Sequence, residues 1–191
     1  MDLPYKELTL PSLVKDVQAV FWEHIDPHGL PPYPNRPLRA FRVSSTDSKH
    51  QAIRDLMVKY PFLDDHLLLF KLAAKTATGI HLDGLGDKVQ RGSSCNIPVE
   101  GCTEKSPTEF FEINPNDLFH DRINTTRFLK PNSTAKKIYE YSMTDSPVLC
   151  NTQMAHRVNN EQGNDVRVSV SWTIRRGWTW DKISEFIAMN Y

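Results

Sequence analysis

The chain has 191 residues and a mass of 22.0 kDa, which is the size of one ordinary domain. Lysine and arginine number 23, as do aspartate and glutamate, so the formal net charge is zero and gives no sign of a nucleic-acid or anionic-membrane partner. No apolar run approaches the ~18–20 residues of a membrane span. The first residues lack the basic start and apolar stretch of a signal peptide, so we expect a cytoplasmic protein.

Residues 1–61 are expected to form two helices separated by a proline-rich loop. The first runs from Ser12 to about Glu23, with apolar residues at helical spacing. Five prolines between residues 26 and 40 exclude a regular helix or a central strand there. The second helix is predicted from Ser48 to Lys59, and Pro61 ends it.

Residues 62–175 have the character of a β domain, with short extended stretches between turn signals. They are predicted at 67–70, 80–83, 93–99, 108–113, 148–159 and 166–174. The polar segment 114–146 is expected to be an insertion, irregular or weakly helical at Thr134–Tyr141. Residues 176–191 would close the chain with a short helix. The prediction is a single domain, mainly β with flanking helices, built as a sandwich or barrel.

The three cysteines, Cys95, Cys102 and Cys150, are odd in number and none has C-x-x-C spacing. This pattern disfavours a disulfide framework or a zinc ribbon, and we expect free thiols.

The last predicted strand alternates without a break from Val166 to Ile174. One face carries Val166, Val168, Val170, Trp172 and Ile174, and the other carries Arg167, Ser169, Ser171 and Thr173. The polar face either meets water or lines the interior of a barrel. In the second case Arg167 and Ser169 project side by side and could hold one carboxylate.

Histidine and aspartate in His81-Leu82-Asp83 share one side of an extended segment, and His156 lies on a later strand. Two histidines and one carboxylate form the facial triad suited to non-haem Fe(II), and tetrahedral zinc with a water remains chemically possible. A second match, His24-Ile25-Asp26, is discounted because it falls at the end of a predicted helix, where i and i+2 diverge. Surface or core roles are expected for His28, His50, His66 and His120.

The ordered series His81-x-Asp83, His156, Arg167-x-Ser169 resembles the motif of the Fe(II)- and 2-oxoglutarate-dependent oxygenases. The resemblance covers about residues 62–175 and implies a double-stranded β-helix (jelly-roll) core. The segment from His81 to Cys102 is also loosely similar to the aspartyl/asparaginyl β-hydroxylase branch. That branch often lacks the acidic ligand, whereas this chain has Asp83.

The resemblance implies a role for each matched residue. His81, Asp83 and His156 would bind Fe(II), Arg167 would pair with the distal carboxylate of 2-oxoglutarate, and Ser169 would add a hydrogen bond. Arg91 and Asn96 lie where a contact to cosubstrate or substrate is possible; a solvent salt bridge and a backbone-satisfying amide are the alternatives. Asp83 argues against halogenation, since halogenating relatives carry a small residue there.

The expected activity is therefore hydroxylation of a C–H bond of an amino acid, a peptidyl residue or a small metabolite, with O2 consumed and succinate and CO2 released. The alternatives are a cupin-like metalloenzyme that does not use 2-oxoglutarate, and a non-catalytic jelly-roll binding module. The loop 26–40, with Tyr33, Arg36 and Arg39, and the insertion 114–146 are the expected substrate-facing elements. A nucleic-acid partner is not expected, and substrate and oligomeric state do not follow from the sequence.

Overall fold

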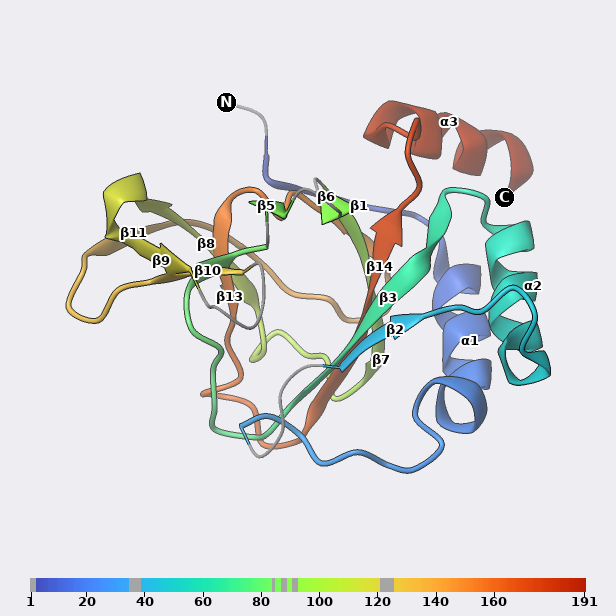
Figure 1. Ribbon diagram of the computed structural model, residues 1–191, viewed down its shortest axis with the longest axis horizontal. Coiled ribbons are helices and arrows are strands. Elements are labelled where there is room, and N and C mark those ends of the chain that lie inside the picture. The colour runs from blue at the N-terminus through green and yellow to red at the C-terminus, as the bar shows by residue number, and fades with distance from the viewer. Residues whose placement is uncertain (1–2, 35–38, 84, 87–88, 91–92, 121–125) are drawn as a thin grey trace.

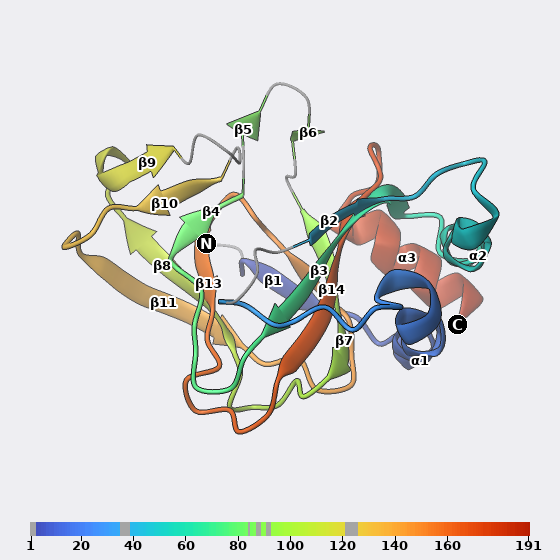
Figure 2. The same cartoon turned by 60° about the horizontal axis from the view of Figure 1, so that its bottom comes forward.

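Two antiparallel sheets face each other, and helices pack on one side of the pair (Figures 1 and 2). The computed structural model describes residues 3–34, 39–83, 85–86, 89–90, 93–120 and 126–191. The architecture is mainly β with flanking helices, as the sequence predicts, and it is of the sandwich or jelly-roll kind. No helix of the described ranges is long and apolar enough to cross a membrane.

The first sheet, here called the major sheet, has the strand order β1-β12-β7-β14-β3-β2. Its strands are β1 (Tyr5–Glu7), β12 (Val148–Cys150), β7 (Ser94–Glu100), β14 (Arg167–Ile174), β3 (Leu63–Leu72) and β2 (Arg39–Arg42). The long central strand β14 pairs with both β3 and β7, so residues from the C-terminal end of the chain hold the middle of the sheet.

The second sheet, here called the minor sheet, has the order β11-β8-β13-β4-β10-β9. Its strands are β11 (Ala135–Tyr141), β8 (Thr108–Ile113), β13 (Ala155–Val158), β4 (His81–Leu82), β10 (Arg127–Leu129) and β9 (Leu118–His120). A short hairpin of β5 (Leu85–Gly86) and β6 (Val89–Gln90) stands apart from both sheets.

Helices cover the outer face of the major sheet. Helix α1 (Pro11–Val20) continues into a π-helical turn, η1 (Phe21–Ile25); α2 (Gln51–Lys59) follows a 3-10 turn, η2 (Ser48–His50); and α3 (Trp180–Asn190) ends the chain. A single apolar cluster joins these helices to the sheet; its buried members include Leu13, Val17, Ile53, Leu67, Ile97, Val170, Trp172 and Ile183. This burial fixes the major sheet as a rigid back wall for the space between the sheets.

Strand β14 is buried on both faces. Val168, Val170 and Trp172 enter the helical core, while Arg167, Ser169 and Ser171 line a cavity between the sheets. The polar face therefore lines the interior, and the alternative of a strand face in open water is wrong.

The structure corrects the prediction for 114–146. Residues 135–141, expected to be weakly helical, form strand β11, which pairs with β8 from Ala135 to Tyr141. The insertion also holds η3 (Pro115–Asp117), β9 and β10, so it builds much of the minor sheet. The helical expectation fails because pairing with β8 supplies backbone hydrogen bonds that local propensity does not reveal.

Other differences follow from the same cause. The expected strand 148–159 is two strands, β12 and β13, which belong to different sheets and are joined by a turn at 151–154. The short strands β1 and β2 lie in the segment expected to be helix and loop, and both are sheet edges. Short edge strands carry few paired residues and hence a weak sequence pattern. All three cysteines are free thiols, as expected.

The proline-rich loop is held against the major sheet. The Tyr33 backbone N–H donates to the Lys71 carbonyl at 2.7 Å, and the Ala73 N–H donates to the Tyr33 carbonyl at 3.0 Å. The buried Asp26 carboxylate accepts a hydrogen bond from Lys71 Nζ at 2.8 Å and another from the Leu30 N–H at 3.0 Å. These contacts order the loop beside β3.

Candidate metal centre and anion pocket

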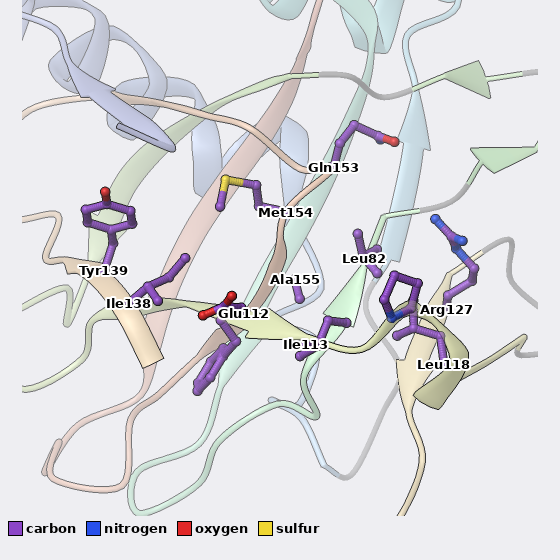
Figure 3. A pocket seen from close by; sticks show the side chains of 12 residues that line it. Leu82, Glu112, Ile113, Leu118, Arg127, Ile138, Tyr139, Gln153, Met154 and Ala155 are labelled. Carbon is purple, nitrogen blue, oxygen red and sulfur yellow. The ribbon is translucent and has the colours of Figure 1, made fainter. Parts of the chain in front are cut away.

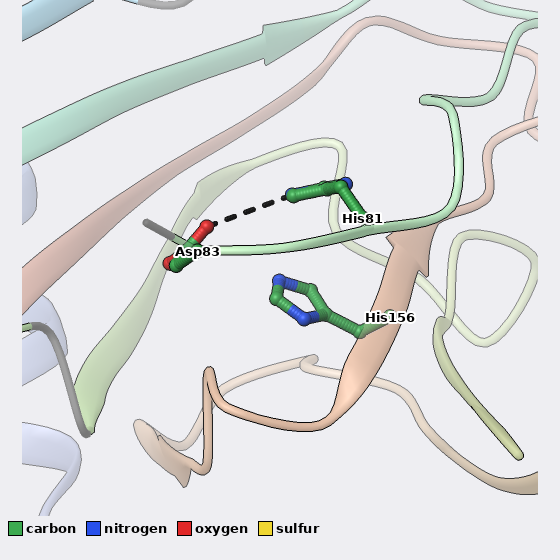
Figure 4. Close-up of side chains that lie close together, drawn as sticks. All are labelled: His81, Asp83 and His156. Carbon is green, nitrogen blue, oxygen red and sulfur yellow. Dashed lines mark ion pairs between the residues drawn. The ribbon is translucent and has the colours of Figure 1, made fainter. Parts of the chain in front are cut away.

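His81, Asp83 and His156 meet at one point on the inner face of the minor sheet (Figure 4). His81 is on β4 and His156 is its register partner on β13. Asp83 follows β4, two residues after His81, so its side chain returns to the same side. One ligand atom from each of the three residues lies within 4.8 Å of the others, and His81 Nε2 is 3.7 Å from Asp83 Oδ1.

Both imidazoles are oriented by backbone carbonyls. His81 Nδ1 lies 2.8 Å from the Gly79 carbonyl oxygen, and His156 Nδ1 lies 2.8 Å from the Met154 carbonyl oxygen. A carbonyl only accepts, so each Nδ1 must carry the proton and donate it. This tautomer leaves the lone pair on Nε2, which is the arrangement of a metal-binding histidine with a supporting partner.

Burial keeps His81 neutral. Desolvation, and secondarily the nearby His156, lowers the pKa of His81 to about 4 despite the opposing effect of Asp83. Asp83 itself is 13% exposed, and its backbone N–H donates to the Thr152 carbonyl at 3.2 Å. A neutral imidazole has no proton to displace before it binds a cation at neutral pH.

Arg167 enters the same cavity from the opposite sheet. Its side chain is only 2% exposed, and its Nη1 donates to Ser169 Oγ at 3.2 Å. Its Nε has no hydrogen-bond partner, and no carboxylate among the described residues forms an ion pair with the guanidinium. A buried cation without a counter-charge is costly, which marks this position as the site for an anionic group from outside the chain.

Asn96 lies on β7 and lines the cavity, but its amide is already engaged. It accepts from Ser94 Oγ at 3.1 Å and donates to the Tyr141 hydroxyl at 2.8 Å. Both partners are side chains, so these bonds are not the backbone contacts expected as the alternative role of Asn96, and its contact with a cosubstrate stays a prediction. Arg91 lies outside the described residues, so its expected role stays a prediction.

Several lining residues were not identified from the sequence. The cavity is bordered by His81, Asp83, His156, Arg167, Ser169 and Asn96 together with Phe70, Ser94, Thr108, Cys150, Thr152, Val158 and Ser171. Burial raises the pKa of Cys150 to about 12, which keeps it a thiol next to Asp83. Period-two alternation already placed Ser171 on the polar face of the last strand and could have found Thr108 in the same way. Cys150 ends β12, and Thr152 lies in the turn between β12 and β13.

The remaining sequence candidates lie elsewhere. In the discounted pair His24 and Asp26, Asp26 binds Lys71, and His24 Nε2 lies 3.7 Å from Glu23. Tyr33 packs along β3 and does not line the cavity. Arg36 and the side chain of Arg39 lie outside the described parts of the chain.

A separate apolar hollow lies on the outer face of the minor sheet (Figure 3). Leu82 and Ala155 line it, and each is the sequence neighbour of a triad histidine that points the other way. The strands β4 and β13 therefore present their histidines to the inter-sheet cavity and apolar side chains to this hollow. The two spaces share no lining residue.

The donor set fits a divalent transition metal. Two imidazoles and one carboxylate on a single side leave open positions, as the 2-His-1-carboxylate arrangement requires. The cation of Arg167 lines the same cavity and is buried. The metal-ligating side chains and the guanidinium of Arg167 therefore face one small cavity, in which the guanidinium can pair with a carboxylate.

No family model matches the chain, and no curated protein matches it. Among solved structures, a prolyl-4-hydroxylase from Pseudomonas putida is similar, with a TM-score of 0.47 and 15% sequence identity over 91% of this chain and 94% of that chain. None of these comparisons points to the aspartyl/asparaginyl β-hydroxylase branch. A likeness of this size does not determine a substrate.

Proposed function

We propose that the protein is an Fe(II)- and 2-oxoglutarate-dependent oxygenase that hydroxylates a C–H bond of a small molecule or a peptidyl residue. The observation that supports this most directly is the pairing of the triad His81, Asp83 and His156 with the uncompensated cation of Arg167 in one cavity. Two facing antiparallel sheets also agree with the double-stranded β-helix core implied by the motif.

Each residue of the cavity has a distinct part in the proposal. His81 and His156 would supply Nε2 and Asp83 a carboxylate oxygen to the metal, while the Gly79 and Met154 carbonyls hold the imidazole planes. Arg167 and Ser169 would bind the distal carboxylate of 2-oxoglutarate by a charge-assisted hydrogen bond and a hydroxyl donor. Fe(II) with bound 2-oxoglutarate supplies the O2 chemistry, which yields succinate and CO2.

Burial serves this chemistry in two ways. The apolar core behind the major sheet keeps β14 fixed, so Arg167 and Ser169 are preorganised for one anion. The buried side chains that line the cavity would also limit water around the metal ligands.

The uncompensated Arg167 separates this proposal from a cupin-like metalloenzyme. A metal site without an anionic cosubstrate gives no reason to bury a guanidinium that lacks a carboxylate partner. A non-catalytic binding module is disfavoured by the complete donor set and the oriented tautomers. Zinc is also compatible with the three donors, but a zinc site does not explain the buried guanidinium of Arg167 beside Ser169.

The decisive experiment adds Fe(II) and then 2-oxoglutarate to the protein under anaerobic conditions. The proposal predicts a weak visible charge-transfer band that needs both additions and is absent in His81→Ala. A protein that binds Fe(II) without forming the band, and that shows no calorimetric binding of 2-oxoglutarate, would contradict the proposal. A succinate-release screen over amino acids, peptides and small metabolites then seeks the substrate.

A further inference from the structure

A row of ring-bearing side chains crosses the minor sheet from the metal centre to its edge. His156 pairs with His81, His81 pairs with Phe128 on β10, and Phe128 pairs with Phe119 on β9. Residues directly opposite each other in antiparallel strands project from the same face. All four rings therefore lie on the inner face, at one level of the sheet.

Successive rings of this row lie close to one another. The ring centroids of His81 and His156 are 4.5 Å apart, those of His81 and Phe128 5.5 Å, and those of Phe128 and Phe119 6.1 Å. These separations are within the range of stacked and tilted aromatic contacts. The Phe128 ring packs against Gly79. A Cβ at position 79 would lie 3.4 Å from the ring.

The row runs from buried side chains to an exposed one. His156 and His81 are buried, Phe128 is half-buried, and Phe119 is 43% exposed. The row thus connects the enclosed ligand atoms to the surface by a continuous aromatic wall. What distinguishes Phe119 from the other exposed apolar side chains is its contact with Phe128, which continues the row from the metal ligands to the surface.

The charged side chain of β10 faces the other way. Arg127 and Leu118 line the outer hollow of Figure 3, on the side of the sheet opposite to Phe128 and Phe119. The described residues of β9 and β10 therefore present only aromatic surface next to His81. A ligand group that lies against Phe128 meets no formal charge from these strands, which favours an uncharged group.

We propose that Phe128 and Phe119 form the substrate-binding wall of the site, here called the Phe119–Phe128 wall, and that it selects an uncharged apolar group, namely an aliphatic or cyclic hydrocarbon side chain of an amino acid or peptide. This inference rests on the proposed oxygenase function. A group stacked on Phe128 lies beside the His81 ring, and so its C–H bonds are presented next to the metal ligands. The rest of a peptide continues past Phe119 toward the solvent.

The test uses N-acetyl amides of leucine and proline as apolar probes, and those of aspartate and lysine as charged probes. Binding is measured by saturation-transfer difference NMR on the protein without added metal, and by perturbation of the charge-transfer band of the anaerobic Fe(II)/2-oxoglutarate protein. We expect the apolar probes to bind at least about fivefold more tightly than the charged ones. Equal affinities, or no binding of either apolar probe, would overturn the proposal.

Variants connect the binding to the wall. Phe119→Ala, at an exposed position, and Phe128→Leu, which keeps an apolar volume, should weaken binding of the apolar probes by at least about fivefold and leave the charged probes unchanged. Met189→Ala, exposed on α3, is the matched control and should bind like the parent. Unchanged affinity in both phenylalanine variants overturns the proposal.

The two proposals fail in different ways. If the parent protein forms no charge-transfer band but Phe119→Ala still loses apolar probe binding in the NMR measurement, the oxygenase function is wrong and the wall stands as a binding site. If the band forms normally in parent and variants while probe affinity never changes, the function stands and the Phe119–Phe128 wall is not the substrate site.

Discussion

Arg167 Nη1 donates to Ser169 Oγ across one repeat of strand β14, while Arg167 Nε, equally buried, has no partner. The serine compensates for one N–H of a guanidinium that has several, and it carries no charge. The pair is therefore an incomplete anion site. The protein supplies the hydrogen-bond donors, and a ligand would supply the anionic acceptor. The same geometry makes a prediction about stability as well as binding.

Replacing Arg167 with methionine should abolish high-affinity 2-oxoglutarate binding without destabilising the ligand-free protein. The variant removes an uncompensated buried charge and keeps an apolar side chain in the cavity. The apparent KM for 2-oxoglutarate should rise at least about 100-fold, as expected for the loss of a charge-assisted contact of about 3 kcal/mol. Calorimetry with 2-oxoglutarate and urea unfolding measure the two effects.

Arg176→Met is the matched control because Arg176 is exposed in the turn after β14, so this substitution should leave both quantities unchanged. If Arg167→Met lowers the free energy of unfolding by several kcal/mol in the absence of ligand, Arg167 is a structural residue. Retained 2-oxoglutarate affinity in this variant would remove it from the proposed role.

His81→Ala and His156→Ala should each lower the affinity for Fe(II) at least about 100-fold, because each removes one of three protein ligands. Anaerobic titration with Fe(II), or with Co(II) as a spectroscopic substitute, measures the affinity directly. His28→Ala, in an exposed loop, serves as the control. A parent-like affinity in both site variants would mean that the metal binds elsewhere, and substrate-dependent succinate production should be lost together with the metal.

The metal-free protein should lose stability as the pH falls from 6.5 toward 4. Burial, with His156 nearby, lowers the pKa of folded His81 to about 4, so in this window the unfolded chain takes up a proton that the folded chain does not. The contribution of neutral His81 to the free energy of unfolding is fully present above pH 6.5. Its loss at lower pH amounts to at most about 3 kcal/mol. Chelator-treated parent and His81→Gln are compared by urea unfolding at several pH values; parallel curves would disprove the effect.

More of the candidate site than of the fold could be predicted from the sequence. Alternation in β14 places Arg167 and Ser169 on one face whatever the rest of the chain does, and His81 and Asp83 share a side for the same reason. Neither inference requires knowing which strands pair. The register of His81 with His156, by contrast, depends on a contact between distant segments that no local pattern contains.

The errors concentrate where pairing partners decide the structure. Residues 135–141 become strand β11 because β8 offers an unpaired edge, not because their own residues demand it. The Phe119–Phe128 wall was missed for the same reason, although the insertion that contains it was expected to face the substrate. The sequence does not show that Phe119 and Phe128 are close to His81, because that proximity depends on the pairing of β4, β10 and β9.

Asp26→Asn tests what holds the proline-rich loop against the major sheet. The carboxylate is fully buried, Lys71 Nζ lies 2.8 Å from it, and Lys71 also lies 5.4 Å from the centroid of the Trp22 ring. Breaking this pair leaves a largely buried ammonium without a counter-charge, so we expect a loss of about 3 kcal/mol in the free energy of unfolding. Asp65→Asn, which breaks an exposed pair with Arg42, should have a much smaller effect on the free energy of unfolding. Similar losses in the two variants would show that burial of the Asp26–Lys71 pair adds nothing, and that backbone pairing of Tyr33 with β3 suffices to hold the loop.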